Sequence, residues 1–102
     1  MNKITLSALL AAAALFASPT YAADAKAGKA LADESCADCH GEDGTGDDKN
    51  PAINGMAVDK FTKAMKEYQA GTRTKSQKMI KEAKKLSAAQ IADLAAYYAT
   101  LK

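Results

Sequence analysis

Hydrophobic residues recur at intervals of three and four along most of this chain, a spacing that places them on one face of a helix. The first such segment follows Asp24, which can serve as its N-cap, and runs toward Cys36. Gly28 lies inside this helix and allows two interpretations, a close approach of another helix or a tolerated surface glycine. The apolar side of the helix consists of Ala27, Ala30 and Leu31.

Three more helices are predicted in the second half of the chain. One is capped by Asp59 and ends at Gly71, one extends over residues 76–85, and the last begins at Ser87, where Gln90 completes a capping box. Their apolar stripes are formed by Phe61, Ala64, Met65 and Tyr68, then by Met79, Ile80 and Ala83, and finally by Ile91, Leu94, Ala95 and Tyr98. Because no segment shows the alternation of a strand, the sequence predicts an all-α domain.

The N-terminal segment differs from the rest because it is almost uncharged. Lys3 precedes fourteen uncharged residues, 4–17, which are too few for a membrane-spanning helix of about 20 residues. Small residues then stand at the −3 and −1 positions of a cleavage site after Ala22. We therefore predict that residues 1–22 are a cleaved signal peptide and that residues 23–102 form an exported domain without stable membrane insertion. An uncleaved membrane anchor is the alternative.

The exported domain would be small and poor in large apolar side chains. It would have eighty residues and no tryptophan. Domains of this size usually need a cross-link or a cofactor to complete a stable core. The composition therefore favours a bound group that adds apolar bulk.

The segment Cys36-Ala37-Asp38-Cys39-His40 carries the most specific chemistry of the chain. Two cysteines separated by two residues, with a histidine directly after the second, are typical of covalent haem c attachment. Each thiol can add across one vinyl group of haem, and a helical turn brings both sulfur atoms to one edge of the porphyrin. The imidazole of His40 is then available to the iron. We predict covalent attachment at Cys36 and Cys39 and iron ligation by His40.

Other uses of these residues fit the sequence less well. A thioredoxin-like pair belongs in a βαβ pattern, and no strand is predicted ahead of Cys36. A structural zinc site needs four ligands, whereas the chain has two cysteines and one histidine. A disulfide would leave His40 unexplained. The acids Asp43, Asp47 and Asp48 do not match the spacing of an EF-hand calcium loop, so residues 41–50 are interpreted as a solvated loop.

The opposite face of the iron needs a second ligand or stays open. The single histidine is already used, which excludes a second imidazole from the same chain. Met65 belongs to a helical apolar stripe and is interpreted as a core residue. Met56, in a loop, and Met79, ahead of the last helix, remain as candidates, and position slightly favours Met79.

These residues together resemble those of small bacterial class I cytochromes c. Residues 36–41 match the attachment site of that family. Residues 28–31 resemble its N-terminal helix, whose glycine packs against the C-terminal helix, and residues 94–97 resemble that second helix. Residues 51–55 resemble the Pro-x-Leu-x-Gly segment of the family. The resemblance covers the whole exported domain and departs at Ala32, where members often have an aromatic residue.

The resemblance implies a class I cytochrome c fold, with four to five short helices wrapped around one covalent haem c and its iron. It implies that the carbonyl of Pro51 accepts a hydrogen bond from His40, and that Met79 is the second axial ligand. It also implies a periplasmic one-electron carrier that is not an enzyme.

A finer resemblance and two alternatives remain. Residues 50–85 resemble short periplasmic soluble cytochromes and the cytochrome subunit of flavocytochrome c sulfide dehydrogenase. One alternative is therefore a haem subunit of a flavoprotein complex. The other is an open-site haem enzyme or gas sensor, in which Met79 does not ligate the iron.

Charge is distributed unevenly along the exported domain. Residues 24–48 contain eight acidic and two basic residues, whereas residues 49–102 contain eleven basic and four acidic residues. We predict that a lysine cluster around Met79 forms a basic rim at the haem edge that attracts an acidic redox partner. A merely solvated helix face is the alternative. The low net charge of an exported domain gives no support to nucleic acid binding. The cluster consists of Lys75, Lys78, Lys81, Lys84 and Lys85.

Overall fold

The computed structural model describes residues 22–102, so the predicted signal peptide lies outside the described residues except for Ala22. Five helices and no strands occur in this range, and the all-α prediction is confirmed. None of these helices is long and apolar enough to cross a membrane. The helices are α2 (Ala25–Ser35), α3 (Ala37–His40), α4 (Val58–Ala70), α5 (Gln77–Lys84) and α6 (Ala88–Ala99).

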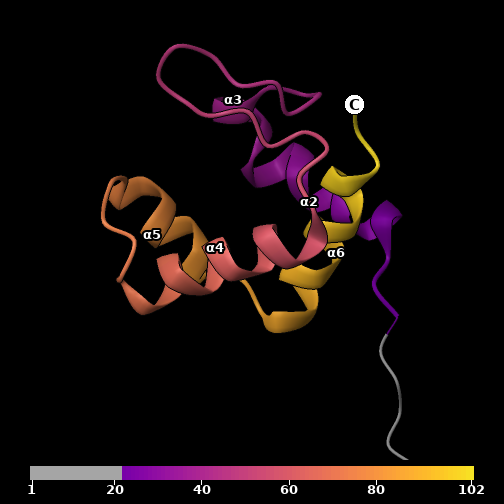
Figure 1. The fold of residues 1–102 in the computed structure, drawn as a ribbon. Coiled ribbons are helices and arrows are strands. Elements are labelled where there is room, and N and C mark those ends of the chain that lie inside the picture. Colours follow the sequence, from indigo (N-terminus) through magenta and orange to yellow (C-terminus); the bar gives the residue numbers. More distant parts are fainter. Residues whose placement is uncertain (1–21) are drawn as a thin grey trace, which may run out of the picture.

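Helices α2 and α6, the first and last helices of the described chain, lie against each other (Figure 1). Gly28 of α2 is buried where they cross. A Cβ atom at Gly28 would lie 2.6 Å from the backbone carbonyl carbon of Asp93 and 2.9 Å from the Cβ of Tyr97. The close-approach interpretation of Gly28 is therefore correct, because a side chain there would force the two helices apart.

The hydrophobic core forms where α4 meets this helix pair. Phe61 and Met65 of α4 are buried in the same cluster as Leu94 and Tyr98 of α6. The rings of Phe61 and Tyr98 stack with their centroids 5.8 Å apart. Helix α5 packs on α4 and contributes the fully buried Ala83. Met65 is thus a core residue, as predicted.

The buried face of α2 differs from the predicted one. Ala30 is exposed, whereas Gly28 and Ala32 are buried. Glycine and alanine carry little hydrophobic signal, yet small side chains are what a close helix crossing requires. Ala32, where the family that the sequence resembles often has an aromatic residue, is 2% exposed.

Most of the predicted helix ends are confirmed. The side chains of Asp24, Ser76 and Ser87 accept backbone N–H groups at the starts of α2, α5 and α6. Gln90 completes the capping box of α6. Gly71 ends α4 in the left-handed conformation, with φ of +75°.

Asp59 does not cap α4, and this prediction is wrong. The helix begins at Val58, one residue before Asp59, and the preceding Ala57 makes no side-chain capping bond. Asp59 lies in the first turn, where the helix dipole also favours a negative charge. The sequence could not separate these two positions, because an acid is favourable at both.

Replacing Gly28 with alanine should destabilise the fold. Alanine has a higher helix propensity than glycine by about 1 kcal/mol, so a tolerated surface glycine would gain stability from this change. At the α2–α6 crossing the added methyl group meets the α6 backbone, and overpacking of this kind costs about 1–3 kcal/mol. Urea unfolding, monitored by the circular dichroism of the helices, measures the difference in the free energy of unfolding between this variant and the unaltered protein.

The exposed Ala30 offers a matched control on the same helix. The substitution Ala30→Gly should cost about 1 kcal/mol from helix propensity alone. If Gly28→Ala unfolds at the same or a higher urea concentration than the unaltered protein, the crossing tolerates a side chain.

Candidate functional site

Cys36, Cys39 and His40 lie in one turn at the end of α2. Cys36 is the C-cap residue of α2 and the N-cap residue of α3. Its carbonyl accepts the N–H groups of Cys39 and His40, at 3.3 and 3.0 Å. Both thiols are free and partly buried, and His40 is 5% exposed. The structure therefore brings the three residues of the predicted attachment motif together in a single turn.

The imidazole of His40 is held by the loop that follows it. Its Nδ1 lies 2.8 Å from the carbonyl oxygen of Pro51. Because a carbonyl oxygen only accepts, this hydrogen bond places the imidazole proton on Nδ1 and leaves the lone pair on Nε2. Metal-ligating histidines usually have their other nitrogen engaged in this way, which fixes the orientation of the ring. This is the contact that the family resemblance implied.

A glycine allows the loop to return so closely to the histidine. The N–H of Gly46 donates to the carbonyl of His40 at 2.8 Å. Gly46 has a φ of +72°, and a Cβ atom there would lie 2.7 Å from the carbonyl carbon of Pro51. A side chain at this position would therefore displace the carbonyl that orients the imidazole.

Asp47 stabilises the same loop. Its carboxylate accepts the N–H groups of Lys49 and Asn50, both at 2.8 Å. These bonds, the one from Lys49 foremost, lower the pKa of Asp47. From the sequence, Asp47 is interpreted only as part of a solvated loop. The recognisable signal for its role is an aspartate in a glycine-containing loop, whose carboxylate can bond the backbone two residues further on, as in an Asx-turn.

Tyr98 of α6 lies against the first cysteine. Its side chain is 1% exposed, and its hydroxyl lies beside the thiol of Cys36. Burial is the main cause that raises the pKa of both groups, and the neighbouring Tyr98 hydroxyl opposes this rise at Cys36. The ring of Tyr98 also packs closely on Gly44, where a Cβ atom would lie 3.0 Å from Cε1. Tyr98 thus connects the core to the turn that carries the cysteines.

Helix α5 lies beside the second cysteine. The Nζ of Lys78 is 3.4 Å from the Sγ of Cys39. Met79 follows Lys78 in the chain and is partly buried against the core. Met56 is also partly buried there, whereas Met65 is buried, at 6% exposure. The two methionines that the sequence left as candidate ligands are thus the two that the core does not enclose.

Gln69 fixes the position of α5, a role that was not predicted from the sequence. Its Nε2 donates to the carbonyls of Ala83 and Leu86, at 2.8 and 2.9 Å. Carbonyls at the end of a helix lack intrahelical partners, so one side chain of α4 completes the end of α5. No local pattern indicates this contact, because the partners lie 14 and 17 residues further along the chain.

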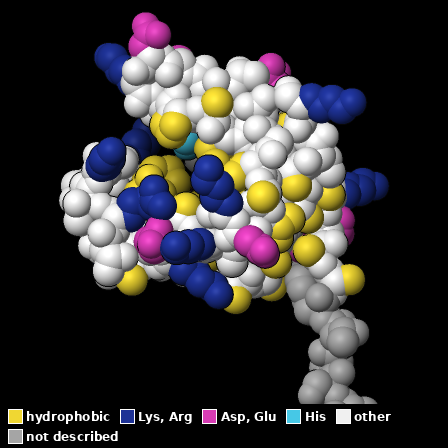
Figure 2. Space-filling model, in the orientation of Figure 1, with side chains coloured by type: hydrophobic (Ala, Val, Ile, Leu, Met, Phe, Trp, Pro, Cys, Tyr) yellow, Lys and Arg dark blue, Asp and Glu magenta, His cyan; other side chains and the backbone are white. Residues whose placement is uncertain are grey.

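Figure 2 shows a hollow in the face between the loop after α3 and helices α4 and α5. Hydrophobic side chains form its floor, and Lys and Arg side chains stand around its mouth. A small patch in the histidine colour is visible inside it, and the chain has a single histidine. An apolar floor beside a buried imidazole is the environment that a porphyrin requires.

Comparison with known proteins identifies the family. The family described as cytochrome c matches residues 25–102. The solved structure of cytochrome c4 from Acidithiobacillus ferrooxidans is similar, with a TM-score of 0.74 and 32% identity over 82% of this chain and 53% of that chain. Reduced recombinant cytochrome c4 from Pseudomonas stutzeri gives a TM-score of 0.68 and 28% identity over 88% of this chain and 57% of that chain. No curated protein matches the chain.

The fold and the Cys36–His40 turn define a small class I cytochrome c, as predicted. The chain belongs to the cytochrome c family and spans about half the length of the two solved relatives. Its cofactor is therefore covalently bound haem c with its iron. The residues present fit this group, because two thiols and an oriented imidazole share one turn beside an apolar hollow. Within residues 22–102, no group of three or more His, Cys, Asp or Glu side chains could hold a metal ion alone.

Replacing Tyr98 with phenylalanine should change how stability responds to alkaline pH. The pKa of Tyr98 is raised in the folded protein, mainly by burial, above an unfolded value of about 10. The stability that this shift contributes is fully present below about pH 10 and is lost as pH rises further, because the unfolded chain ionises first. The free energy of unfolding should therefore fall above pH 10, and less steeply in Tyr98→Phe.

A second substitution separates the hydroxyl from the ring. Tyr98→Ala also loses the stack on Phe61 and should cost about 3–5 kcal/mol at neutral pH, as for other buried aromatic rings. Equal alkaline slopes in Tyr98→Phe and the unaltered protein would contradict the raised pKa.

Proposed function

We propose that this protein is a periplasmic one-electron carrier. Its haem c is bonded to Cys36 and Cys39, and His40 and Met79 are the axial ligands of the iron. Bound haem c supplies reversible one-electron oxidation and reduction of its iron. With both axial positions filled by side chains there is no site for a substrate, so the protein is not an enzyme.

The orientation of His40 is the observation that carries this proposal. A buried imidazole could simply be a core residue, but then its ring would not need to follow the second cysteine directly. Here the hydrogen bond to Pro51 directs the lone pair of Nε2 away from the loop. The loop bonds made by Gly46 and Asp47 keep the Pro51 carbonyl in place. The lone pair of Nε2 is therefore available to iron, and the imidazole ring is held in a single orientation.

Two observations support Met79 as the opposite ligand. Met65 is buried in the core on α4, at 6% exposure, and is therefore less accessible to a bound group. Met79 stands on α5 directly after Lys78, whose ammonium group contacts the sulfur of Cys39. Met79 is thus the partly buried methionine whose chain neighbour reaches the cysteine turn.

The export prediction completes this proposal. Haem c is attached outside the bacterial cytoplasm, so a cleaved leader over residues 1–22 and a working domain over residues 23–102 agree with the cofactor. The structure of the Acidithiobacillus ferrooxidans cytochrome c4 is described as supporting a complex-induced tuning of electron transfer. That description supports electron transfer to partner proteins as the role of this chain.

Replacing Met79 with alanine should remove the methionine-to-iron charge-transfer band from the spectrum of the oxidised protein. It should also lower the reduction potential, because a soft thioether ligand favours reduced iron. Carbon monoxide should then bind rapidly to the reduced protein. Absorption spectra with and without carbon monoxide, and a potentiometric titration, measure these changes.

Met56→Ala and Met65→Ala are the matched controls and should keep the band. Met65→Ala should also lose about 2–5 kcal/mol of stability as a buried truncation. If the band survives in Met79→Ala and disappears in Met56→Ala, the loop methionine is the ligand. If the unaltered protein lacks the band and already binds carbon monoxide rapidly, the open-site alternative replaces the electron carrier.

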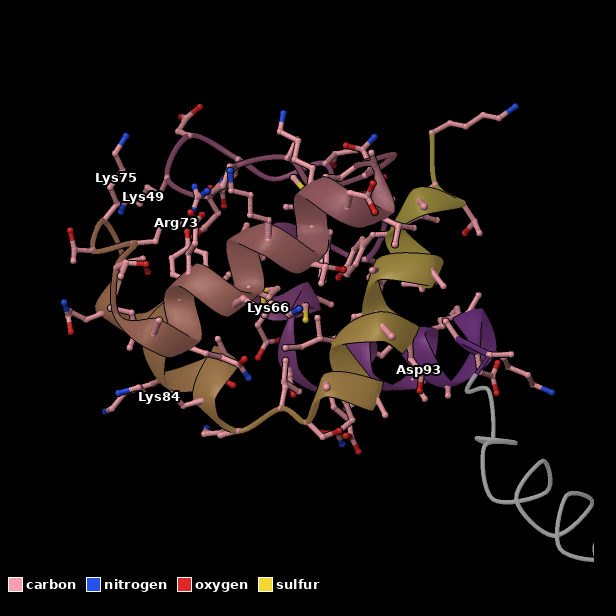
Figure 3. The ribbon with its side chains drawn as sticks, turned by 60° about the horizontal axis from the view of Figure 1, so that its bottom comes forward. Lys49, Lys66, Arg73, Lys75, Lys84 and Asp93 are labelled. Carbon is pink, nitrogen blue, oxygen red and sulfur yellow. The ribbon has the colours of Figure 1, made fainter. Side chains whose placement is uncertain are left out.

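The partner surface of the carrier is proposed to be basic. Figure 3 shows Lys49, Arg73 and Lys75 at one end of the domain, the first from the loop after α3 and the others from the α4–α5 connection. Arg73 is paired with Glu67 at 2.8 Å, so its charge is partly offset. Lys75 is exposed. Together with the lysines of α5, these side chains would attract an acidic redox partner.

Removing positive charge from α5 and from the connection before it should slow electron exchange with an acidic partner. The triple substitution of Lys75, Lys81 and Lys84 by glutamine should lower the association rate by about tenfold or more at low salt. The haem spectrum should not change. Raising the salt should slow the unaltered protein much more than the variant, because screening shortens to about 8 Å at physiological ionic strength. Stopped-flow measurement at several salt concentrations gives these rates.

Lys26→Gln is the control, since this exposed lysine lies on α2 in the acidic part of the chain. It should leave the rate nearly unchanged. An association rate that responds neither to salt nor to the triple substitution would leave the lysines as a solvated helix face.

A further inference from the structure

Helix α5 carries the proposed iron ligand Met79, but apolar burial attaches it only weakly to the rest of the domain. It packs on α4 (Figure 1), and Ala83 is its one buried residue. The connection that leads into it is exposed over residues 71–75. A segment with so few buried apolar contacts opens at a low cost in free energy, unless other bonds hold it.

Two hydrogen bonds from Gln69 of α4 supply such a hold. Its Nε2 donates to the carbonyl oxygens of Ala83 and Leu86, at 2.8 and 2.9 Å. A primary amide has two N–H groups, so this one side chain serves both carbonyls. Gln69 is itself partly buried, and hydrogen bonds shielded from water are stronger than exposed ones.

These hydrogen bonds act close to Met79. Met79 and Ala83 are four residues apart on α5, so their side chains lie on the same face of the helix, about 6 Å apart along its axis. Ala83 is 0% exposed, and Met79 is partly buried against the same core. Because α5 has only eight residues, a movement of its end away from α4 also displaces Met79.

We propose that Gln69 is the positioning residue of Met79. Its two hydrogen bonds keep α5 against α4 and thereby keep the thioether of Met79 on the iron. Opening of α5 is then the movement that exposes the iron to an outside ligand. This inference rests on the proposed ligation by Met79 and adds the residue that controls how often that ligand leaves.

The test uses haem-loaded, exported protein in its reduced form, with carbon monoxide as the probe. Carbon monoxide binds only while Met79 is away from the iron, so its binding rate is proportional to the fraction of open molecules. The substitution Gln69→Leu nearly preserves the size of the side chain and removes both N–H donors. Stopped-flow absorption measures the binding rate.

Carbon monoxide should bind about tenfold faster to Gln69→Leu than to the unaltered protein, because partners that orient a metal ligand affect its binding about 10–100-fold. A tenfold change is equivalent to about 1.4 kcal/mol in the opening equilibrium. The methionine-to-iron charge-transfer band of the oxidised variant should remain at neutral pH, since most molecules stay closed. If Gln69→Leu does not fold, Gln69→Asn, whose amide is too short to reach both carbonyls, should still raise the rate several-fold.

Ala30→Gly is the matched control. This exposed position on α2 loses stability through helix propensity alone and does not contact α5. Its carbon monoxide binding rate should be nearly that of the unaltered protein. Amide hydrogen exchange should be faster in α5 of Gln69→Leu than in α5 of Ala30→Gly, which separates a local opening from a general loss of stability.

Two results would overturn the inference, and the charge-transfer band distinguishes them. If the unaltered protein has the band, but Gln69→Leu binds carbon monoxide no faster than Ala30→Gly does, Gln69 does not position the ligand. Ligation by Met79 would then still stand. If the unaltered protein lacks the band and binds carbon monoxide rapidly, ligation by Met79 is rejected, and this inference is rejected with it.

Discussion

The close contact of α2 with α6 at Gly28 is the constraint on which the rest of the structure depends. A bare Cα lets the α6 backbone at Asp93 approach within a distance that any side chain would prevent. This approach brings the end of α2, and with it Cys36, against the hydroxyl of Tyr98. The Tyr98 ring in turn stacks on Phe61 and fixes α4. The positions of the terminal helices, the core and the cysteine turn thus all depend on the close approach that Gly28 allows.

The opposite wall of the site depends on bonds between elements rather than on apolar burial. Helix α5 has one buried residue, Ala83, and the amide of Gln69 holds its end against α4. The loop after α3 has no regular structure, and Gly46 and Asp47 supply the bonds that return Pro51 to His40. Helix α5 and the loop after α3 have few buried apolar contacts of their own. A bound cofactor therefore adds most stability to these two segments.

A covalent haem suits a domain of this composition. The described core contains small residues at its helix crossing and only a few large side chains, led by Tyr98, Ile91 and Leu94. Small domains bury too little apolar surface to be stable without help. The haem c of this family is an apolar group of the required size, and the hollow in Figure 2 provides the surface on which it can lie.

The sequence by itself determined the five-residue attachment motif, the all-α class and most helix ends, because each depends on residues a few positions apart. The spacing of Cys36, Cys39 and His40 and the capping box of Ser87 are signals of this local kind. Only the tertiary structure decided that Gly28 and Ala32, rather than Ala30, are buried, and that Gln69, Asp47 and Asp93 hold elements in place. Gln69 and Asp93 act on partners at least 14 residues away, and Gly28 acts through space that it leaves empty. Periodicity and capping rules describe one element at a time, whereas these contacts exist only once separate elements have packed together.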